Sequence, residues 1–402
     1  MDDKQLTLDT VYKARYILKD VIRETDVIDA PSLSNGRKVS LKTENLQVTG
    51  SFKVRGAGYK MSQLSEEERA RGVIACSAGN HAQGVALAAA RNGIHAVICL
   101  PDSAPISKVE ATRALGAEIC LVSGVYDDAY RKAVDLQQEK GYTFIHPFDD
   151  PYVIAGQGTI ALELIEQVPD MKAVVVPIGG GGLISGIAYT IKMLNPAIRV
   201  YGVQAKGAPG MLSSIQAHHI SELEKVHTIA DGIAVKKPGS LTYELVSRYV
   251  DDVVTVTDDE ISAAILALME KHKLVTEGAG AVSAAAVMFG KIPEQEGRTV
   301  CVLSGGNIDV TILSRVISRG LLMSGRSCEL MMELVDRPGQ LLLVSRVIAE
   351  MGGNVTRVHH EHTCEGSDIN GCYLKVEMET RNFDHIARIR EALEKEGIKI
   401  VN

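Results

Sequence analysis

The sequence lacks the features of a secreted, membrane-spanning or nucleic-acid-binding protein. Glycines or charges interrupt every apolar run well short of the ~20 residues that cross a bilayer. The N-terminal segment is acidic and has no apolar stretch, so we expect no signal peptide. The net charge of −7 opposes nucleic acid or an anionic membrane as a main partner. The seven cysteines show no CxxC spacing, and several lie in apolar runs, which predicts reduced thiols and a cytoplasmic location.

Short β-rich runs alternate with helical patterns from about residue 38 to 320. Buried-strand patterns occur at residues 72–77, 96–100, 117–122, 173–178, 199–204 and 299–304. Such alternation is typical of α/β folds with parallel sheets and crossover helices, and 402 residues suffice for two or three domains. We predict a domain of residues 1–322 with two three-layer lobes. The small lobe covers about 43–150, and the large lobe covers 1–42 and 151–322.

The pattern changes near residue 325. Residues 327–402 follow the order strand, helix, strand, strand, helix, strand, with the first helix expected from Pro338 to Met351. This βαββαβ order is typical of ferredoxin-like domains. A unit of this size has an open sheet edge that a second copy could cover. We therefore expect a homo-oligomer.

A run of glycines follows the predicted strand at 173–178 and opens a helix. Its members are Gly179, Gly180, Gly181 and Gly182, followed by Leu183. Backbone N–H groups converge there at a helix N-terminus, which predicts a phosphate site, whereas a tight turn alone needs only one or two glycines. A rival G-x-G-x-x-A pattern at 156–161 follows a poor strand, so we do not expect a dinucleotide site there.

Three further segments carry candidate chemistry. Lys53 lies next to Phe52 at a helix start that we expect Ser51 to cap. Alone, such a lysine is usually a solvated surface group, but beside a phosphate loop it is a candidate Schiff-base lysine. The second segment is a strand-to-helix turn whose exposed N–H groups suit a carboxylate; it contains Ser77, Ala78, Gly79, Asn80 and His81. The third is a strand end at Ser304, whose hydroxyl suits a heterocyclic nitrogen.

Taken together and in order, the segments SFKVRGA, SAGNHAQG, GGGGL and SGGN resemble the fold type II pyridoxal-phosphate enzymes, the tryptophan synthase β-like kind. Within that group the chain is most similar to the threonine dehydratase (threonine ammonia-lyase) family over about residues 5–320. The C-terminal segment, with Asp336-Arg337-Pro338-Gly339 after its first strand, resembles an ACT regulatory domain.

The resemblance implies roles for particular residues. Lys53 would hold pyridoxal 5'-phosphate and move the Cα proton. Phe52 would pack beside the cofactor ring, Asn80 would bond its 3-oxygen, and Ser304 would meet its pyridine nitrogen. The phosphate would be held by Gly179, Gly180, Gly181, Gly182 and Leu183. The substrate carboxylate would be received by Ser77, Gly79, Asn80 and His81. The family also implies a tetramer that deaminates threonine and serine, with an amino-acid effector at the ACT domain.

Alternatives remain open on the sequence. Serine racemases resemble the chain and carry a serine as second acid–base group where this chain has Ala78, which cannot move a proton. A sulfur-transferring synthase of the same fold is another alternative, which would need a different second-substrate pocket. A non-catalytic amino-acid sensor is a third, which the intact Lys53 argues against. Glu277 is either a substrate-side carboxylate or a solvated loop residue. His360 and His362 share one strand face and His359 does not; since two ligands do not close a zinc site, we expect no metal there.

Overall fold

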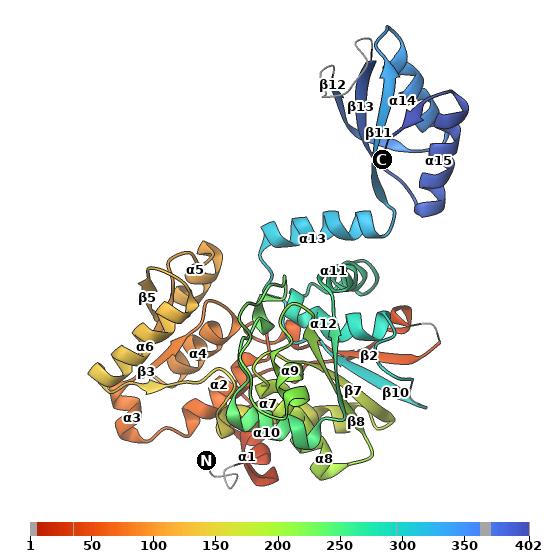
Figure 1. Ribbon diagram of the computed structural model, residues 1–402. Coiled ribbons are helices and arrows are strands. Elements are labelled where there is room, and N and C mark those ends of the chain that lie inside the picture. The colour runs from red at the N-terminus through yellow and green to blue at the C-terminus, as the bar shows by residue number, and fades with distance from the viewer. Residues whose placement is uncertain (1–5, 35, 295, 362–370, 402) are drawn as a thin grey trace. The chain divides into compact units, whose positions relative to one another are not determined.

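The computed structural model describes residues 6–34, 36–294, 296–361 and 371–401. By its internal contacts, the chain divides into two compact units, residues 1–310 and 311–402. Both are drawn in Figure 1. No helix in the described part of the chain is long and apolar enough to cross a membrane. The six described cysteines are free thiols, while Cys364 and His362 lie outside the described residues.

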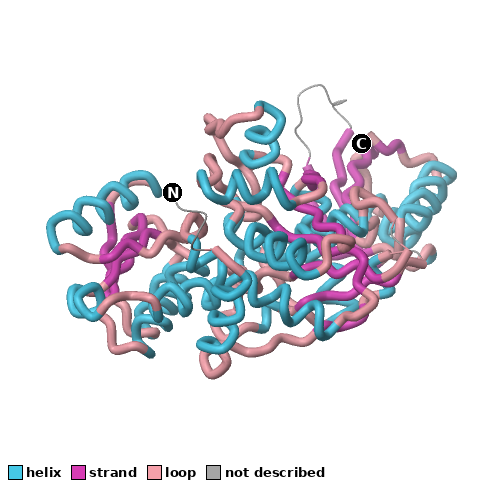
Figure 2. The backbone as a smooth tube through the Cα atoms, turned by 90° about the horizontal axis from the view of Figure 1, so that it is seen from below, coloured by secondary structure: helices cyan, strands magenta, loops and turns pink. Residues whose placement is uncertain are grey.

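The first unit contains a four-stranded parallel sheet in the order β5-β4-β3-β6. Its strands are β3 (Val73–Cys76), β4 (Ala96–Pro101), β5 (Glu118–Val122) and β6 (Thr143–Phe144). The helices from this part of the chain are α2 (Lys53–Ser62), α3 (Glu66–Arg71), α4 (Asn80–Arg91), α5 (Ile106–Ala114) and α6 (Tyr126–Lys140). Alternate residues of β3 face opposite ways: Val73 and Ala75 pack on the side of α2 and α4, and Ile74 and Cys76 on the side of α6. The sheet is therefore the middle of three layers, at the left in Figures 1 and 2.

The larger sheet of this unit has six strands in the order β1-β2-β10-β7-β8-β9. These are β1 (Val27–Asp29), β2 (Lys38–Lys42), β7 (Met171–Pro177), β8 (Arg199–Ala205), β9 (Asp252–Val256) and β10 (Arg298–Val302). All neighbouring pairs are parallel except β1 with β2, which adds an antiparallel edge to the parallel sheet expected from the sequence. Helices of this part are α1 (Leu8–Leu18), α7 (Pro151–Gln167), α8 (Gly182–Leu194), α9 (Gly210–Ala217), α10 (Ser240–Tyr249), α11 (Asp258–Ala267) and α12 (Gly278–Met288). Short turns of 3₁₀ helix occur at Pro31–Leu33, Glu44–Leu46 and Asp231–Ile233, and a π-helical turn at Leu268–His272.

A buried ionic cluster fixes α2 against α7. The Arg55 guanidinium lies 2.5 Å from a Glu163 oxygen and 2.7 Å from a Glu44 oxygen, and all three side chains are buried. Gly156 of α7 lies against the Arg55 backbone, where an added Cβ would stand 2.6 Å from the Arg55 oxygen. The glycines at 156 and 158 lie inside α7, so the G-x-G-x-x-A pattern serves helix packing. Because Lys53 begins α2, this cluster also positions that lysine.

The boundary between the units falls in α13 (Val310–Met323). Val310 belongs to the first unit, and the second unit begins at the next residue, Thr311. The elements that follow are β11 (Ser327–Val335), α14 (Gln340–Glu350), β12 (Asn354–Glu361), β13 (Gly371–Glu379), α15 (Phe383–Lys395) and β14 (Lys399–Ile400). The expected βαββαβ order is confirmed, and the antiparallel sheet has the order β12-β13-β11-β14. Apolar residues of β11 and β13 pack under α14 and α15.

The expected start of the first helix of this unit was wrong. The helix begins at Gln340 rather than Pro338, because Gly339 adopts a φ of +95° at the N-cap and the backbone is not helical before it.

Candidate active site

Lys53 is the first residue of α2, and its amine is partly enclosed. The amine donates a hydrogen bond of 2.8 Å to the backbone oxygen of Pro147 and lies 5.3 Å from the centre of the Phe52 ring. Burial lowers the pKa of Lys53 to about 8, against an opposing attraction from the Glu277 carboxylate. A lysine with this pKa is in part neutral near pH 8 and can act as a nucleophile or a base.

Ser51 does not cap this helix, which corrects the expectation from the sequence. The N-cap is Phe52 in a helical conformation, without a side-chain bond. The Ser51 backbone instead pairs with Gly305 in a β-bridge, which holds the segment in line with the strand end. The Ser51 hydroxyl is buried and has no hydrogen-bond partner among the described residues. An unpartnered buried hydroxyl two residues from Lys53 is what a missing ligand would leave.

Ser304 lies directly beside this segment. Its backbone oxygen accepts a hydrogen bond of 3.1 Å from the Phe52 N–H, and its buried hydroxyl donates to the Ala279 oxygen at 3.3 Å. The second bond is long, so the hydroxyl can rotate toward another partner. The backbone hydrogen bond between Phe52 and Ser304 therefore holds the Ser304 segment next to the segment that contains Lys53.

The glycine loop joins β7 to α8, and no side chain caps the helix. Gly180 and Gly182 lie against Phe148: a Cβ on Gly180 would stand 2.4 Å from its ring, and one on Gly182 would stand 2.8 Å from its Cα. Gly181 has a φ of +101°, which favours glycine. The Thr242 hydroxyl donates a hydrogen bond of 2.6 Å to the Gly180 oxygen, so this carbonyl of the loop already has a partner.

Residues 147 and 148 connect the loop with the lysine. The Pro147 oxygen accepts from the Lys53 amine, and the next residue, Phe148, packs on the glycines. Neither residue had been singled out from the sequence. The segment carries no motif of its own, and only the folded chain brings it between two others.

The N-terminus of α4 supplies the fourth segment. The Asn80 amide donates to Glu277 at 2.6 Å, and its oxygen accepts from Asn307 at 2.8 Å. Ser77 and Gly79 are partly exposed at the same turn, and an added Cβ on Gly79 would meet nothing within 4 Å. The turn thus leaves open space next to the backbone N–H groups in the first turn of α4, and this arrangement suits a carboxylate.

His81 is buried within the first turn of α4. Its ring Nε2 lies 2.8 Å from the Ile145 oxygen. Burial, followed by the nearby Lys53 charge, lowers the pKa of His81 to about 3, so its ring is neutral at pH 7. The side chain is therefore engaged with the protein, and only its backbone faces the start of the helix.

Glu277 is a buried carboxylate rather than a solvated loop residue. It occupies the N-cap position of α12 without a side-chain bond to the helix, and it is only 4% exposed. Burial, with the nearby Asp231 charge second, raises the pKa of Glu277 to about 7. Sequence patterns had left its environment open, and Asn307 had not been considered, although it ends the SGGN segment.

Fold and site together define an α/β enzyme with a lysine of lowered pKa that residues 147 and 148 connect to a glycine loop at a helix N-terminus. Residues 18–305 match the family model described as pyridoxal-phosphate dependent enzyme. The chain belongs to the pyridoxal-phosphate dependent enzyme family.

Similar proteins extend this comparison. Over 397 residues, which are 98% of this chain and 99% of the relative, it is 47% identical to an L-threonine ammonia-lyase of Thermotoga maritima. Processed threonine deaminase isoform 2 of Solanum lycopersicum superposes with a TM-score of 0.74 at 39% identity, covering 79% of this chain and 94% of that one. A maize serine racemase superposes with a TM-score of 0.74 at 36% identity, covering 79% and 99%.

The residues present fit pyridoxal phosphate. The uncapped N-terminus of α8 offers N–H groups and a positive helix end for the phosphate dianion. Lys53 offers an amine for the aldehyde, and the unpartnered Ser51 hydroxyl lies close by. The Ser304 hydroxyl and the Asn80 amide provide neutral polar groups for the ring.

Proposed function

We propose that this chain is a lyase that removes water and then ammonia from L-threonine, and from L-serine, giving 2-oxobutanoate and pyruvate. The observation that carries the proposal is the convergence of Lys53, the glycine loop, Asn80 and Ser304 in one site. The near full-length similarity to an L-threonine ammonia-lyase supports the choice of substrate.

Lys53 holds the cofactor and moves the proton at Cα. Its pKa of about 8 supports both tasks, because a lysine with an ordinary pKa near 10.5 would be almost fully charged at neutral pH. The phosphate is held by the backbone N–H groups of Gly179, Gly180, Gly181, Gly182 and Leu183. Phe52 packs beside the ring.

The substrate carboxylate binds at the N-terminus of α4. Ser77, Gly79, Asn80 and His81 contribute there, with His81 acting through its backbone because its ring bonds Ile145. The Asn80 amide also bonds the 3-oxygen of the cofactor. Its contacts with Glu277 and Asn307 hold it in one orientation for this purpose.

Two residues direct the reaction toward elimination. Pyridoxal phosphate, when bound, supplies an electron sink for the pair left on Cα when its proton is removed. Ser304 would meet the ring nitrogen with a neutral hydroxyl, which would not enforce protonation as an aspartate would, and would so favour prompt loss of the β-hydroxyl. Ala78 offers no second acid–base group, so racemisation is at most a weak side activity.

A product assay tests this function. The purified chain is supplied with L-threonine or L-serine, and 2-oxoacid release is measured together with D-serine by chiral separation. We expect 2-oxoacid formation to exceed D-serine formation. Predominant D-serine formation would instead favour the serine racemase alternative, and no product of either kind would contradict both the lyase and the racemase assignments.

We infer a catalytic domain of residues 1–322 and an ACT-like regulatory domain of residues 327–402 that binds an amino-acid effector. The βαββαβ order and the sheet order support the second assignment. The residues of the edge strand β12 are exposed or half-buried, and Leu342 of α14 is 72% exposed. Such surfaces support a homo-oligomer, proposed as a tetramer. The free cysteines support a cytoplasmic location.

Truncation after Gly325 tests the regulatory role. Activity is measured with and without isoleucine or valine in the full chain and in the truncated chain. We expect a several-fold change in half-saturation, corresponding to a coupling of about 1–3 kcal/mol, in the full chain only. A full chain that ignores every amino acid tested contradicts regulation by such ligands.

A further inference from the structure

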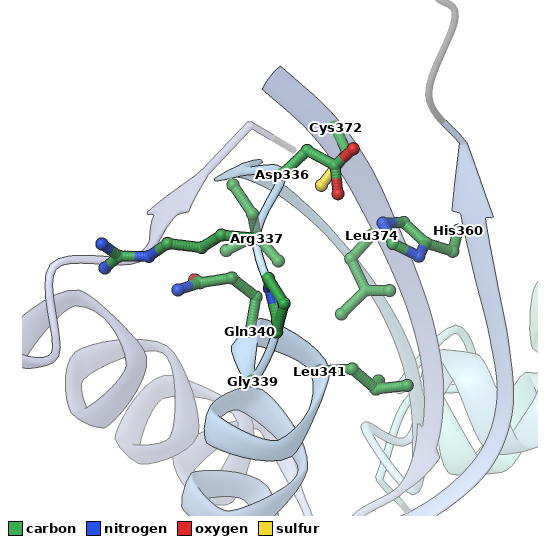
Figure 3. Close-up of a pocket in the computed structure, with 10 residues that line it drawn as sticks. Asp336, Arg337, Gly339, Gln340, Leu341, His360, Cys372 and Leu374 are labelled. Carbon is green, nitrogen blue, oxygen red and sulfur yellow. The ribbon is translucent and has the colours of Figure 1, made fainter. Parts of the chain in front are cut away.

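A cavity opens at one end of the sheet of the second unit, and none of the residues that we place in the active site line it. Its volume is about 470 Å³. It is lined by Leu334, Asp336, Arg337, Pro338, Gly339, Gln340, Leu341, His360, Cys372 and Leu374. Figure 3 shows the carboxylate of Asp336, the ring of His360 and the sulfur of Cys372 at the same side of this cavity.

These three side chains come from three neighbouring strands. Asp336 directly follows β11, His360 lies on β12, and Cys372 lies on β13 between them. In the sheet register His360 is opposite Leu374, while Cys372 is opposite Leu334 of β11. Residues 372 and 374 share a face because strand side chains alternate. His360 and Cys372 therefore stand on the face that the helices cover, and the Asp336 carboxylate lies near both of them at the end of β11.

Their ligand atoms lie close enough together to share one ion. A carboxylate oxygen, an imidazole nitrogen and the thiol sulfur are all within 4.8 Å of one another. Metal–ligand bonds of about 2.0–2.3 Å in a tetrahedral site place donors roughly 3.5 Å apart. Asp336 and His360 are exposed and Cys372 is buried, so rotation of the two exposed side chains can close the remaining ~1 Å.

We propose that Asp336, His360 and Cys372 form a binding site for a borderline-soft divalent cation such as Zn²⁺ or Co²⁺. One oxygen, one nitrogen and one sulfur ligand match the preferences of these ions, whereas Mg²⁺ and Ca²⁺ take oxygen ligands. Three protein ligands leave a fourth position, which faces the cavity and accepts water or a small ligand. The Arg337 side chain points away from the three donors, so its charge is not directed at the ion (Figure 3).

Sheet pairing explains why the sequence did not reveal this site. The histidine run at 359–362 offered two ligands on one face, and two do not close a site. The remaining donors lie 24 residues before His360 and 12 residues after it, at positions that only the strand order β12-β13-β11 brings together.

Cobalt titration of the full-length holoenzyme tests the proposal. Co²⁺ alone is added, and two absorptions are followed: the visible bands of tetrahedral cobalt and the sulfur-to-cobalt charge-transfer band. We expect one Co²⁺ per chain with thiolate ligation, displaced by Zn²⁺. Cys372→Ala should abolish the charge-transfer band. His360→Ala and Asp336→Asn should weaken Co²⁺ affinity at least about tenfold, since loss of even a supporting residue costs 10–100-fold.

Two matched variants serve as controls. Cys328→Ala removes another buried cysteine of the same core, and His359→Ala removes the neighbouring histidine of β12. Both should bind Co²⁺ like the unmodified chain. Because His360 is exposed, its replacement tests the site even if Cys372→Ala destabilises the core. Absence of a thiolate band, its survival in Cys372→Ala, or an equal loss in the two controls would overturn the proposal.

Discussion

Asn80 at the start of α4 donates a 2.6 Å hydrogen bond to Glu277, the buried residue at the N-cap position of α12. The bond links a helix that packs on the four-stranded sheet to one that packs on the six-stranded sheet. Burial raises the pKa of Glu277 to about 7, so this contact lies close to a protonation change at physiological pH. We propose that Asn80 contacts both substrate and cofactor, so its bond to Glu277 bears directly on how both are held.

Glu277→Gln should remove a pH-dependent part of the stability. Between pH 4.5 and 7 the folded state keeps the Glu277 proton, while the unfolded state loses it. The stabilisation is therefore complete below pH 4.5 and is lost as the pH rises through 7. The shift from 4.5 to about 7 corresponds to about 3 kcal/mol.

The measurement is urea unfolding of both proteins at pH 5 and pH 8, with equal cofactor saturation. The free energy of unfolding of the unmodified chain, relative to Glu277→Gln, should be lower at pH 8 than at pH 5. Parallel pH dependences in the two proteins would show that Glu277 titrates normally.

Lys53→Ala should retain the fold and lose covalent attachment of pyridoxal phosphate. Turnover should fall by at least about 10³-fold, because no other residue supplies the amine and the proton transfer together. Attachment is measured by borohydride reduction followed by mass analysis of the chain, and turnover by 2-oxoacid release. Lys60→Ala, at the other end of α2, is the control and should keep both properties. Near-normal turnover in Lys53→Ala would contradict the assignment of Lys53 as the catalytic residue.

Ala78→Ser should raise D-serine formation relative to dehydration. The new hydroxyl stands at the turn that precedes Asn80, where racemases of similar sequence carry a second acid–base group. The ratio of D-serine to pyruvate is measured for L-serine as substrate. Ala78→Gly changes the same position without adding a hydroxyl and should leave the ratio unchanged. An unaltered ratio in Ala78→Ser would contradict the proposed placement of this residue.

Gly180→Ala should weaken cofactor binding by displacing the glycine loop. An added Cβ would stand 2.4 Å from the Phe148 ring, far inside van der Waals contact. We expect at least a tenfold rise in the dissociation constant for pyridoxal phosphate, about 1.4 kcal/mol, measured by fluorescence titration of the cofactor-free protein. Phe148→Leu in the same chain relieves part of the clash and should recover part of the affinity. An unaffected dissociation constant in Gly180→Ala would mean that the loop does not hold the phosphate.

The sequence by itself determined the elements and the local motifs. Alternating buried runs and helical patterns located β3, β4, β7 and β8, and the glycine run at 179–182 indicated a helix start that binds anions. These features depend on residues close in the chain, whose side-chain period and backbone freedom are local properties. The βαββαβ order of the second unit was predictable for the same reason.

Only the tertiary structure decided which of these segments meet and in what environment. Ser51 does not cap a helix, and its backbone pairs with Gly305, a residue some 250 positions away that only the folded chain brings beside it. Glu277 became a carboxylate with a pKa of about 7 only through burial and the nearby charge of Asp231. Asp336, His360 and Cys372 meet through strand pairing. Contacts and desolvation of this kind depend on long-range packing, and the spacing of residues along the chain does not contain them.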